Sequence, residues 1–388
     1  MSQRPERILT THAGSLPRPV ELASLFARTY RGEPVDAAEL AERVDTAAED
    51  VIARQVAAGI DIGNDGEQGR ESFFTYVQHR MTGFGGVGEH RRSFRDVTDF
   101  PDYVDLLRAQ QPAATGRVNL IRPPQAIGEI EYLDTTAIDA ECARVVGAVG
   151  DGGFVEGFLT APSPGIITAA MDNRHYDNDD AYLDAVADAL AVEYRRIVDA
   201  GLILQIDAPD LAMERHGSFA AASNAEFVGF VDRVIDATNR ATADLDPSRI
   251  RLHVCWGNYG GPHTHDIELA ELLPHLYRAR VGGFLLSMAN PRHAHEFAEL
   301  ARQPLPPNVT VAAGVIDVTT NYVEHPAVVA DRIVRAAVAV GDPTRVVACT
   351  DCGFDTAAGF GLVAADVAWA KLGALRAGAD LATTQLFS

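Results

Sequence analysis

The chain has 388 residues, and its 54 acidic and 33 basic side chains give a formal net charge of -21. This balance argues against nucleic acid or an anionic membrane surface as the main partner, because both bind basic surfaces. The first residues form no apolar signal segment and no apolar run approaches the ~20 residues of a membrane span, so we expect a cytoplasmic protein. The 4 cysteines are too few and too irregularly spaced for a disulfide framework, which favours metal binding or catalysis for any that matter.

Short β-rich apolar runs alternate with longer Ala-rich helical stretches, a pattern typical of parallel strands joined by helices. The eight expected strands lie at residues 8–15, 60–67, 154–161, 202–209, 251–256, 282–289, 309–317 and 345–351. Eight β-α units predict an α/β fold of the TIM-barrel type, one catalytic domain over residues 1–388, with its functional residues at the carboxyl ends of the strands.

The interval between the second and third expected strands is too long for one connecting helix. Residues from about 80 to 150 contain a glycine-rich stretch, paired prolines and the extended segment IGEIEYL. We therefore expect an insertion with a hairpin of its own between these two strands.

Every expected strand ends in polar residues, which parallel strands would bring to one mouth of the barrel. These residues are His12, Ser15, Asp65, Glu67, Thr160, Ser163, Asp207, His253, Cys255, Ser287, Asp317, Thr319, Asp351 and Cys352. A polar strand end alone indicates little, but the whole set predicts one site. We assign substrate binding to His12, Ser15, Glu67, Thr160, Asp207 and Ser287, and catalysis to Asp317 and Thr319.

A histidine and a cysteine two residues apart end the fifth expected strand. In an extended strand such residues point to the same side, so His253 and Cys255 would face one point. Cys352 ends the eighth strand at the same mouth, and one nitrogen with two sulfurs predicts a Zn²⁺ site with an open position. Taken alone, the H-x-C pair is better explained by a buried core histidine and a small apolar cysteine.

Other metal-type residues are expected to lie outside this site. Cys349 is three residues from Cys352, so it should point the other way, into the core. The pair His263 and His265 follows a Gly-Gly-Pro turn and is expected in a loop near the mouth. The pair His293 and His295 is expected on the surface at a helix start.

A zinc ion that already has two anionic sulfur ligands is poorly suited to activating water. It suits a substrate thiol, whose pKa it lowers so that the thiolate can attack an alkyl carbon. Two carboxylates, Glu67 and Asp207, could then hold the ammonium group of a thiol amino acid. A structural hydrogen-bond network remains the alternative for both carboxylates.

Seven motifs in this order, HAGSLPRP, DGEQGRE, FLTAPSP, LQIDAPDL, H-V-C, GVIDVTTNYVEHP and TDCGFDT, resemble the catalytic barrel of cobalamin-independent methionine synthases. The chain is similar to the shorter relatives with a single barrel. The resemblance implies zinc on His253, Cys255 and Cys352, and Ser15, Glu67 and Asp207 around a homocysteine-like thiol that receives an alkyl group from a second small molecule.

The chain departs from that family at two positions. Ser287 stands where a glutamate supplies a further zinc ligand, and Thr319 stands where a histidine acts as proton donor. Methyltetrahydrofolate is a poor leaving group that needs a proton, so these changes favour a more reactive electrophile. Asp317 and the histidines of GGPHTHD and ANPRHAHE remain alternatives for the acid.

Three other functions stay open at this point. One is the opening of an epoxide by a zinc-bound thiolate, as in the related epoxyalkane:coenzyme M transferases. The second is a metal-free decarboxylase or lyase on a barrel like that of uroporphyrinogen decarboxylase, and the third is a binding protein without catalysis. Glu67 and Asp207 favour an ammonium-bearing thiol over the sulfonate of coenzyme M. Assembly into a homo-oligomer is also left open.

Overall fold

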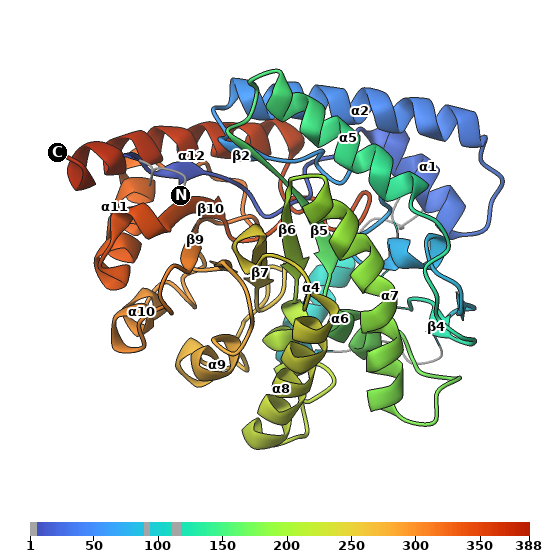
Figure 1. Cartoon of the computed structure of the whole chain (residues 1–388). Helices are drawn as coiled ribbons and strands as arrows, with labels where there is room; N and C mark the ends of the chain where they lie inside the picture. Colours follow the sequence, from blue (N-terminus) through green and yellow to red (C-terminus); the bar gives the residue numbers. More distant parts are fainter. Residues whose placement is uncertain (1–5, 89–93, 111–117, 119, 121) are drawn as a thin grey trace.

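The computed structural model describes residues 6–88, 94–110, 118, 120 and 122–388. Its centre is a parallel sheet of eight strands in the order β1-β10-β9-β8-β7-β6-β5-β2 (Figure 1). The strands are β1 (Leu9–Thr10), β2 (Ile62–Gly63), β5 (Glu156–Pro162), β6 (Ile203–Asp207), β7 (Ile250–Val254), β8 (Gly283–Leu286), β9 (Thr310–Ile316) and β10 (Val346–Thr350). A parallel bridge between Thr11 and Ile62 joins the two ends of the sheet, so the predicted (β/α)8 barrel is confirmed.

Helices surround this barrel, and Figure 1 shows α2, α5 and α12 along one side of it and α7 and α8 along another. The helices before β5 are α1 (Val20–Tyr30), α2 (Ala37–Ala57), α3 (Arg95–Thr98), α4 (Pro101–Gln110) and α5 (Thr136–Gly150). Those after it are α6 (Pro164–Ala170), α7 (Asp179–Asp199), α8 (Asn224–Ala241), α9 (Leu269–Leu276), α10 (Glu299–Arg302), α11 (Pro326–Val340) and α12 (Ala365–Leu386). Side chains fix several starts, such as the capping box of Ser223 and Glu226 at α8.

Each expected strand overlaps an observed one, but the first two observed strands are much shorter than expected. β1 ends at Thr10 and β2 at Gly63, and the segments that follow contain Gly14, Gly66 and Glu67, whose positive φ angles of 133°, 67° and 57° are not those of a strand. The same segments carry Ser15 and Glu67, which line the larger cavity of the structure. Residues that were expected to extend the sheet therefore belong to the loops that form the site.

The expected insertion contains a small antiparallel pair, β3 (Phe84–Gly85) with β4 (Gln125–Ala126). The segment IGEIEYL follows β4 and contributes only an isolated bridge, between Met81 and Tyr132, so its expected hairpin strand lies two residues earlier. Helix α5, inside the expected range, packs on β5 as a barrel helix. Residues 89–93, 111–117, 119 and 121 lie outside the described part of the insertion.

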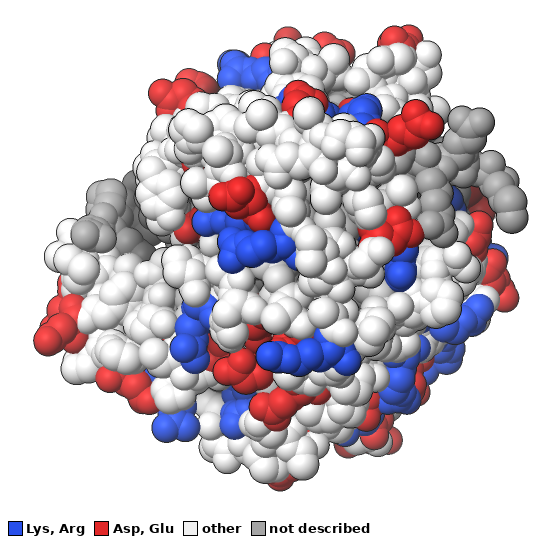
Figure 2. Space-filling model, turned by 90° about the vertical axis from the view of Figure 1, so that its left-hand side faces the viewer, with Lys and Arg blue, Asp and Glu red and all other residues white. Residues whose placement is uncertain are grey.

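The outer surface carries charges of both signs. On the face drawn in Figure 2, Lys and Arg are interspersed with Asp and Glu, with no continuous basic stripe among the described residues. Such a face offers little attraction to a polyanion. Within the described chain, no helix is both long and apolar enough to cross a bilayer.

A buried ion network joins the insertion to the barrel helices. Arg80, which ends the 3-10 helix Thr75–His79, pairs with Glu141 of α5 and with Glu193 of α7, the latter at 3.1 Å. Arg70 also pairs with Glu141 at 2.7 Å and donates to the backbone oxygen of Thr160 at 2.9 Å. All of these charged groups are nearly inaccessible to solvent, so removing one partner would leave a buried charge uncompensated.

We therefore expect Arg80→Met to lower the free energy of unfolding by about 3 kcal/mol, because Glu141 and Glu193 each lose a buried partner. The midpoint of urea denaturation measures this change. The matched control is Arg195→Met, whose exposed pair with Asp244 should contribute less than about 1 kcal/mol. Equal midpoints for the two variants would contradict the role of the network.

Candidate metal centre and substrate cavity

Three residues from two strand ends form a group that can hold a metal ion. One ligand atom each of His253, Cys255 and Cys352 lies within 4.8 Å of the others, and all three residues are buried. His253 belongs to β7 and Cys255 follows it directly, while Cys352 follows β10. A register shift in β10 between Cys349 and Thr350 bends the chain just before Cys352 reaches the mouth.

The orientation of His253 is set by a carboxylate on the neighbouring strand. Asp207 of β6 is in register with His253 of β7, and Oδ1 of Asp207 lies 2.9 Å from Nδ1 of His253. The same oxygen accepts from Nε2 of Gln205 at 2.7 Å. A histidine whose one nitrogen binds a carboxylate is held in the tautomer that presents the other nitrogen to a metal.

The two cysteines at this site influence each other. A hydrogen bond from Cys352, and then the neighbouring His253, lower the pKa of the Cys255 thiol in spite of its burial. The same bond and burial raise the pKa of Cys352. Although burial opposes it, the hydrogen bond with Asp207 raises the pKa of His253 to about 10. The lowered pKa favours the thiolate of Cys255, whereas the His253 ring would release the proton on its second nitrogen when a cation binds.

A cavity of about 600 Å³ opens beside this group. Polar residues line its inner end, namely Ser15, Glu67, Asp207, His253, Cys255 and Cys352. Its outer walls are mostly apolar and aromatic, with Phe73, Phe74, Phe94, Val97, Tyr103, Val104, Leu107, Met213, Phe360 and Leu362. A volume of this size with a few polar groups at one end is typical of a small-molecule site.

Glu67 is held in an unfavourable backbone conformation at the inner end of this cavity. Its φ is 57°, and Nη2 of Arg18 donates to its backbone oxygen at 2.8 Å. Oε1 accepts from Thr160 at 2.9 Å, whereas the buried Oε2 finds no partner within the described chain. Burial, and then the charge of Asp207, raise the pKa of Glu67 to about 7. A strained residue with a free buried oxygen indicates a binding role.

Ser287, Asp317 and Thr319 line a second, smaller cavity together with Cys255 and Cys352. This cavity measures about 20 Å³, which is room for one water molecule or ion. Asp317 Oδ1 accepts from both the backbone nitrogen and the hydroxyl of Thr319 at 2.7 Å, so the Thr319 hydroxyl is engaged. Ser287 donates to the backbone oxygen of Asp351.

The remaining two predicted substrate residues lie behind the cavity walls. Nε2 of His12 lies 2.8 Å from Gln55, and its Nδ1 accepts from the backbone nitrogen of Gly14. Burial lowers the pKa of His12 to about 4, so this ring is a neutral part of the barrel interior and lines neither cavity. Thr160 reaches the site only through its hydrogen bond to Glu67.

Two histidines that we did not expect at the site line its smaller cavity. His263 and His293 are 3% and 4% exposed, so the expectation that His293 lies on the surface is wrong. Their paired H-x-H spacing was the available signal, but loops without periodicity do not show which histidine turns inward. Cys349, by contrast, packs in the barrel interior with Ala13 and Leu285, as expected of a core residue.

The raised pKa of Glu67 makes stability depend on pH. The folded-state value of about 7 lies above the usual 4.5, so the unfolded chain loses this proton first and stability falls as pH rises between these values. In metal-free protein, Glu67→Gln should therefore raise the free energy of unfolding at about pH 8 by roughly 1–3 kcal/mol and change it little at about pH 4.

Urea denaturation at the two pH values measures this effect. Glu49→Gln, on the exposed side of α2, is the control and should change neither value. A stability loss in Glu67→Gln at both pH values would show instead that the charged carboxylate stabilises the fold.

No family model matches the chain. Among curated proteins, it is 26% identical over 387 residues to 2-hydroxypropyl-CoM lyase of Xanthobacter autotrophicus, with 89% of each chain covered. It is 24% identical over 347 residues to methionine synthase of Sulfolobus acidocaldarius, with 89% of this chain and 85% of that protein covered.

A solved structure has the same fold over its whole length. The B12-independent methionine synthase of Shewanella sp. W3-18-1, in complex with selenomethionine, superposes with a TM-score of 0.69 and 21% identity, covering 98% of this chain and 99% of that one. These matches confirm the resemblance drawn from the motifs and the expectation of an enzyme. The chain is a homologue of the B12-independent methionine synthases and of 2-hydroxypropyl-CoM lyase.

Proposed function

We propose that this protein transfers an alkyl group, in the simplest case methyl, to the sulfur of a thiol amino acid such as homocysteine, with zinc held by His253, Cys255 and Cys352. The observation that carries this proposal is one cavity whose inner end combines a nitrogen-and-two-sulfur donor set with a pair of carboxylates. Curated homologues that make methionine support the reaction class.

The donor set fits zinc. Two thiolates and one imidazole are ligands that zinc prefers, and three protein ligands leave a position for substrate. Asp207 binds Nδ1 of His253, so Nε2, which lies 3.3 Å from the backbone oxygen of Asp351, would be the nitrogen that binds the metal, as in the usual carboxylate–histidine–metal arrangement. Zinc bound there would lower the pKa of the substrate thiol and keep its sulfur ionised near neutral pH.

The chain's own residues would position the thiol. Glu67 and Asp207 line the cavity next to Cys255 and Cys352, so an amino acid whose sulfur points to the cysteines can place its ammonium between the carboxylates. Thr160 keeps Oε1 of Glu67 in place and leaves Oε2 for the ligand. Arg70 in turn donates to the hydroxyl of Thr160 at 3.0 Å, which fixes this arrangement from behind.

The apolar walls would receive the electrophile and exclude water from the reaction. The thiolate sulfur forms a bond to the alkyl carbon while the bond to the leaving group breaks, and the leaving group departs with that electron pair. The Thr319 hydroxyl is turned to Asp317, and hydrogen bonds occupy both ring nitrogens of His263 and of His293. None of these three side chains therefore points a free proton toward the leaving group. This favours an electrophile whose leaving group departs without strong acid assistance.

Opening of a strained epoxide by the same thiolate is the second candidate. The similarity to 2-hydroxypropyl-CoM lyase supports it, as does Thr319 in place of a histidine. A sulfonate-bearing thiol would require cationic partners, however, and the described lining of the larger cavity contains carboxylates but neither Lys nor Arg. We therefore place the ammonium-bearing thiol first for this chain.

Elemental analysis of purified protein tests the metal centre. We expect Cys352→Ala to lose most of the zinc, because one of three ligands is removed, and Cys349→Ala to keep it, because that buried cysteine lies in the barrel interior. Zinc X-ray absorption of native protein should then show an additional sulfur neighbour when homocysteine is added. Bound zinc whose coordination no thiol changes would refute the proposed function.

Steady-state kinetics tests the ammonium site. Glu67→Gln should raise the KM for homocysteine about 10- to 100-fold, because a buried charged partner of the ammonium is lost. Since the pKa of Glu67 is raised to about 7, the native KM should increase as pH falls below that value, and the variant should lose this dependence. The control substrate is a thiol of equal length without the amino group, whose KM should not respond to the substitution.

A further inference from the structure

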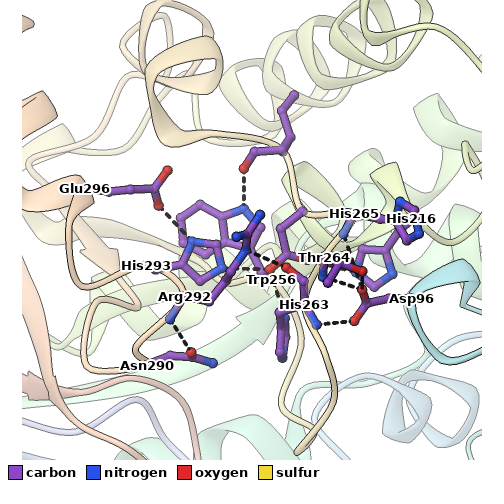
Figure 3. Close-up of polar contacts among 12 residues, drawn as sticks. Asp96, His216, Trp256, His263, Thr264, His265, Asn290, Arg292, His293 and Glu296 are labelled. Atoms are coloured by element: carbon purple, nitrogen blue, oxygen red, sulfur yellow. Dashed lines mark hydrogen bonds and ion pairs between the residues drawn. The ribbon is translucent and has the colours of Figure 1, made fainter. Parts of the chain in front are cut away.

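A second group of metal-type side chains lies beside the zinc candidate, in the loops that follow β7 and β8. Ligand atoms of His263, Asp266 and His293 lie within 4.8 Å of one another. Their side chains are only 4%, 2% and 5% exposed. Figure 3 shows His293, His263 and His216 from left to right, with His263 and His293 on two different loops.

Both imidazoles direct one nitrogen to the same carboxylate oxygen. Nδ1 of His263 and Nε2 of His293 lie 2.8 and 2.7 Å from Oδ2 of Asp266. Their remaining nitrogens have oxygen partners of their own, the backbone oxygen of Tyr259 at 3.2 Å and Oε2 of Glu296 at 2.8 Å. A carbonyl or carboxylate behind each imidazole is the usual outer shell of histidine metal ligands.

His216 provides an independent indication of a missing ligand. It is 1% exposed, and neither of its ring nitrogens meets full hydrogen-bond geometry within the described chain, although the backbone of Trp256 is close enough to favour the protonated ring. Its Nε2 lies 3.4 Å from Oδ1 of Asp266, a buried oxygen that also lacks a hydrogen bond among the described residues. Buried polar atoms without partners are rare, and a cation between them would satisfy both.

The charge of the group fits a divalent cation. Four hydrogen bonds to oxygen from the rings of His263 and His293 require both rings to be doubly protonated. One divalent ion would replace the two protons that point to Asp266, on Nδ1 of His263 and Nε2 of His293, and the total charge would stay the same. The other N–H group of each ring would keep its partner, Tyr259 or Glu296. Metal binding would thus cause no net change in charge around Asp266.

The loop that carries His263 is fixed in a conformation that needs support. His263 has a φ of 54°, which is unfavourable for a residue other than glycine. Asp96 of α3 accepts from the backbone nitrogens of His263, Thr264 and His265, contacts that Figure 3 shows to one side of the histidine group. The insertion therefore holds the His263 side chain in place before any ligand arrives.

We propose that His263, Asp266 and His293, with His216 as an additional ligand, form a second site for a divalent transition-metal ion. Nitrogen and carboxylate donors without sulfur suit a borderline cation such as Zn²⁺ or Co²⁺. His263 and His293 line the small cavity that Cys255 and Cys352 also line, so this ion would border the reaction space. The inference goes beyond thiol alkylation and does not depend on it.

Titration of metal-stripped protein with Co²⁺ separates the two sites, because only the cysteine site gives a sulfur-to-cobalt charge-transfer band. We expect about two ions per chain for native protein. Cys352→Ala should lose the charge-transfer band and keep the other ion. His293→Gln should keep the charge-transfer band, but the ion at the histidine site should bind at least about tenfold more weakly.

His295→Gln is the matched control. This exposed histidine lies two residues from His293, near Glu268 and Glu296, and its loss should leave both ions in place. Loss of the second ion in His295→Gln instead of His293→Gln would overturn the proposal.

Crystals of native protein grown with zinc give a test that needs no variant. We expect an anomalous-scattering peak between His263 and His293 in addition to one at Cys255 and Cys352. A sulfur-site peak alone, with one cobalt ion per native chain, would refute the second site and leave the proposed function standing. A peak at the histidines alone would refute the zinc-thiol proposal and support the second site.

Discussion

The hydrogen bond between Asp207 and His253 connects the parts of the site. It exists because β6 and β7 are parallel neighbours whose register places the two residues side by side. The contact orients the imidazole for metal binding, and it also brings a carboxylate to the wall of the larger cavity, beside Glu67. The proposed metal centre and the proposed ammonium site therefore both depend on this one strand pairing.

Buried carboxylates organise the loops around this centre. Asp351 accepts from the backbone nitrogens of Met288 and Ala289 at 2.8 Å and of Asn290 at 2.9 Å, which holds the loop after β8. Asp96 does the same for the loop after β7. Burial raises the pKa of Asp351 to about 7 in spite of these bonds. Some of the acidic residues are therefore buried at the mouth of the barrel, where they hold its loops, and do not contribute to the charge of the outer surface.

The two departures from the methionine synthase pattern have a common structural setting. Ser287 and Thr319 line the small cavity, and both hydroxyls donate to neighbouring oxygens. His263 and His293, from two other loops, line the same cavity. In this chain, His253, Cys255 and Cys352 therefore have two hydroxyls and two histidines as neighbours around the small cavity.

The sequence alone was enough to predict the eight barrel strands and the group His253, Cys255 and Cys352. Apolar runs of period two, glycine-ended helices and polar strand ends are local signals, and the parallel barrel brings strand ends together whatever the loops do. The same signals placed Glu67 and Asp207 at the mouth. They overestimated β1 and β2, which end at Thr10 and Gly63, and they did not predict the positive φ angles at Gly14 and Glu67 beyond these strands.

Only the tertiary structure decided the rest of the site. It showed that His12 bonds to Gln55 and faces away from the cavity, and that His263 and His293 turn inward while His295 stays exposed. Loop residues carry no periodicity from which their direction could be predicted, and Asp96, which fixes the His263 loop, is 167 residues away from it. The sequence determined which chemical groups the strands deliver, whereas long-range hydrogen bonds decided which loop groups join them.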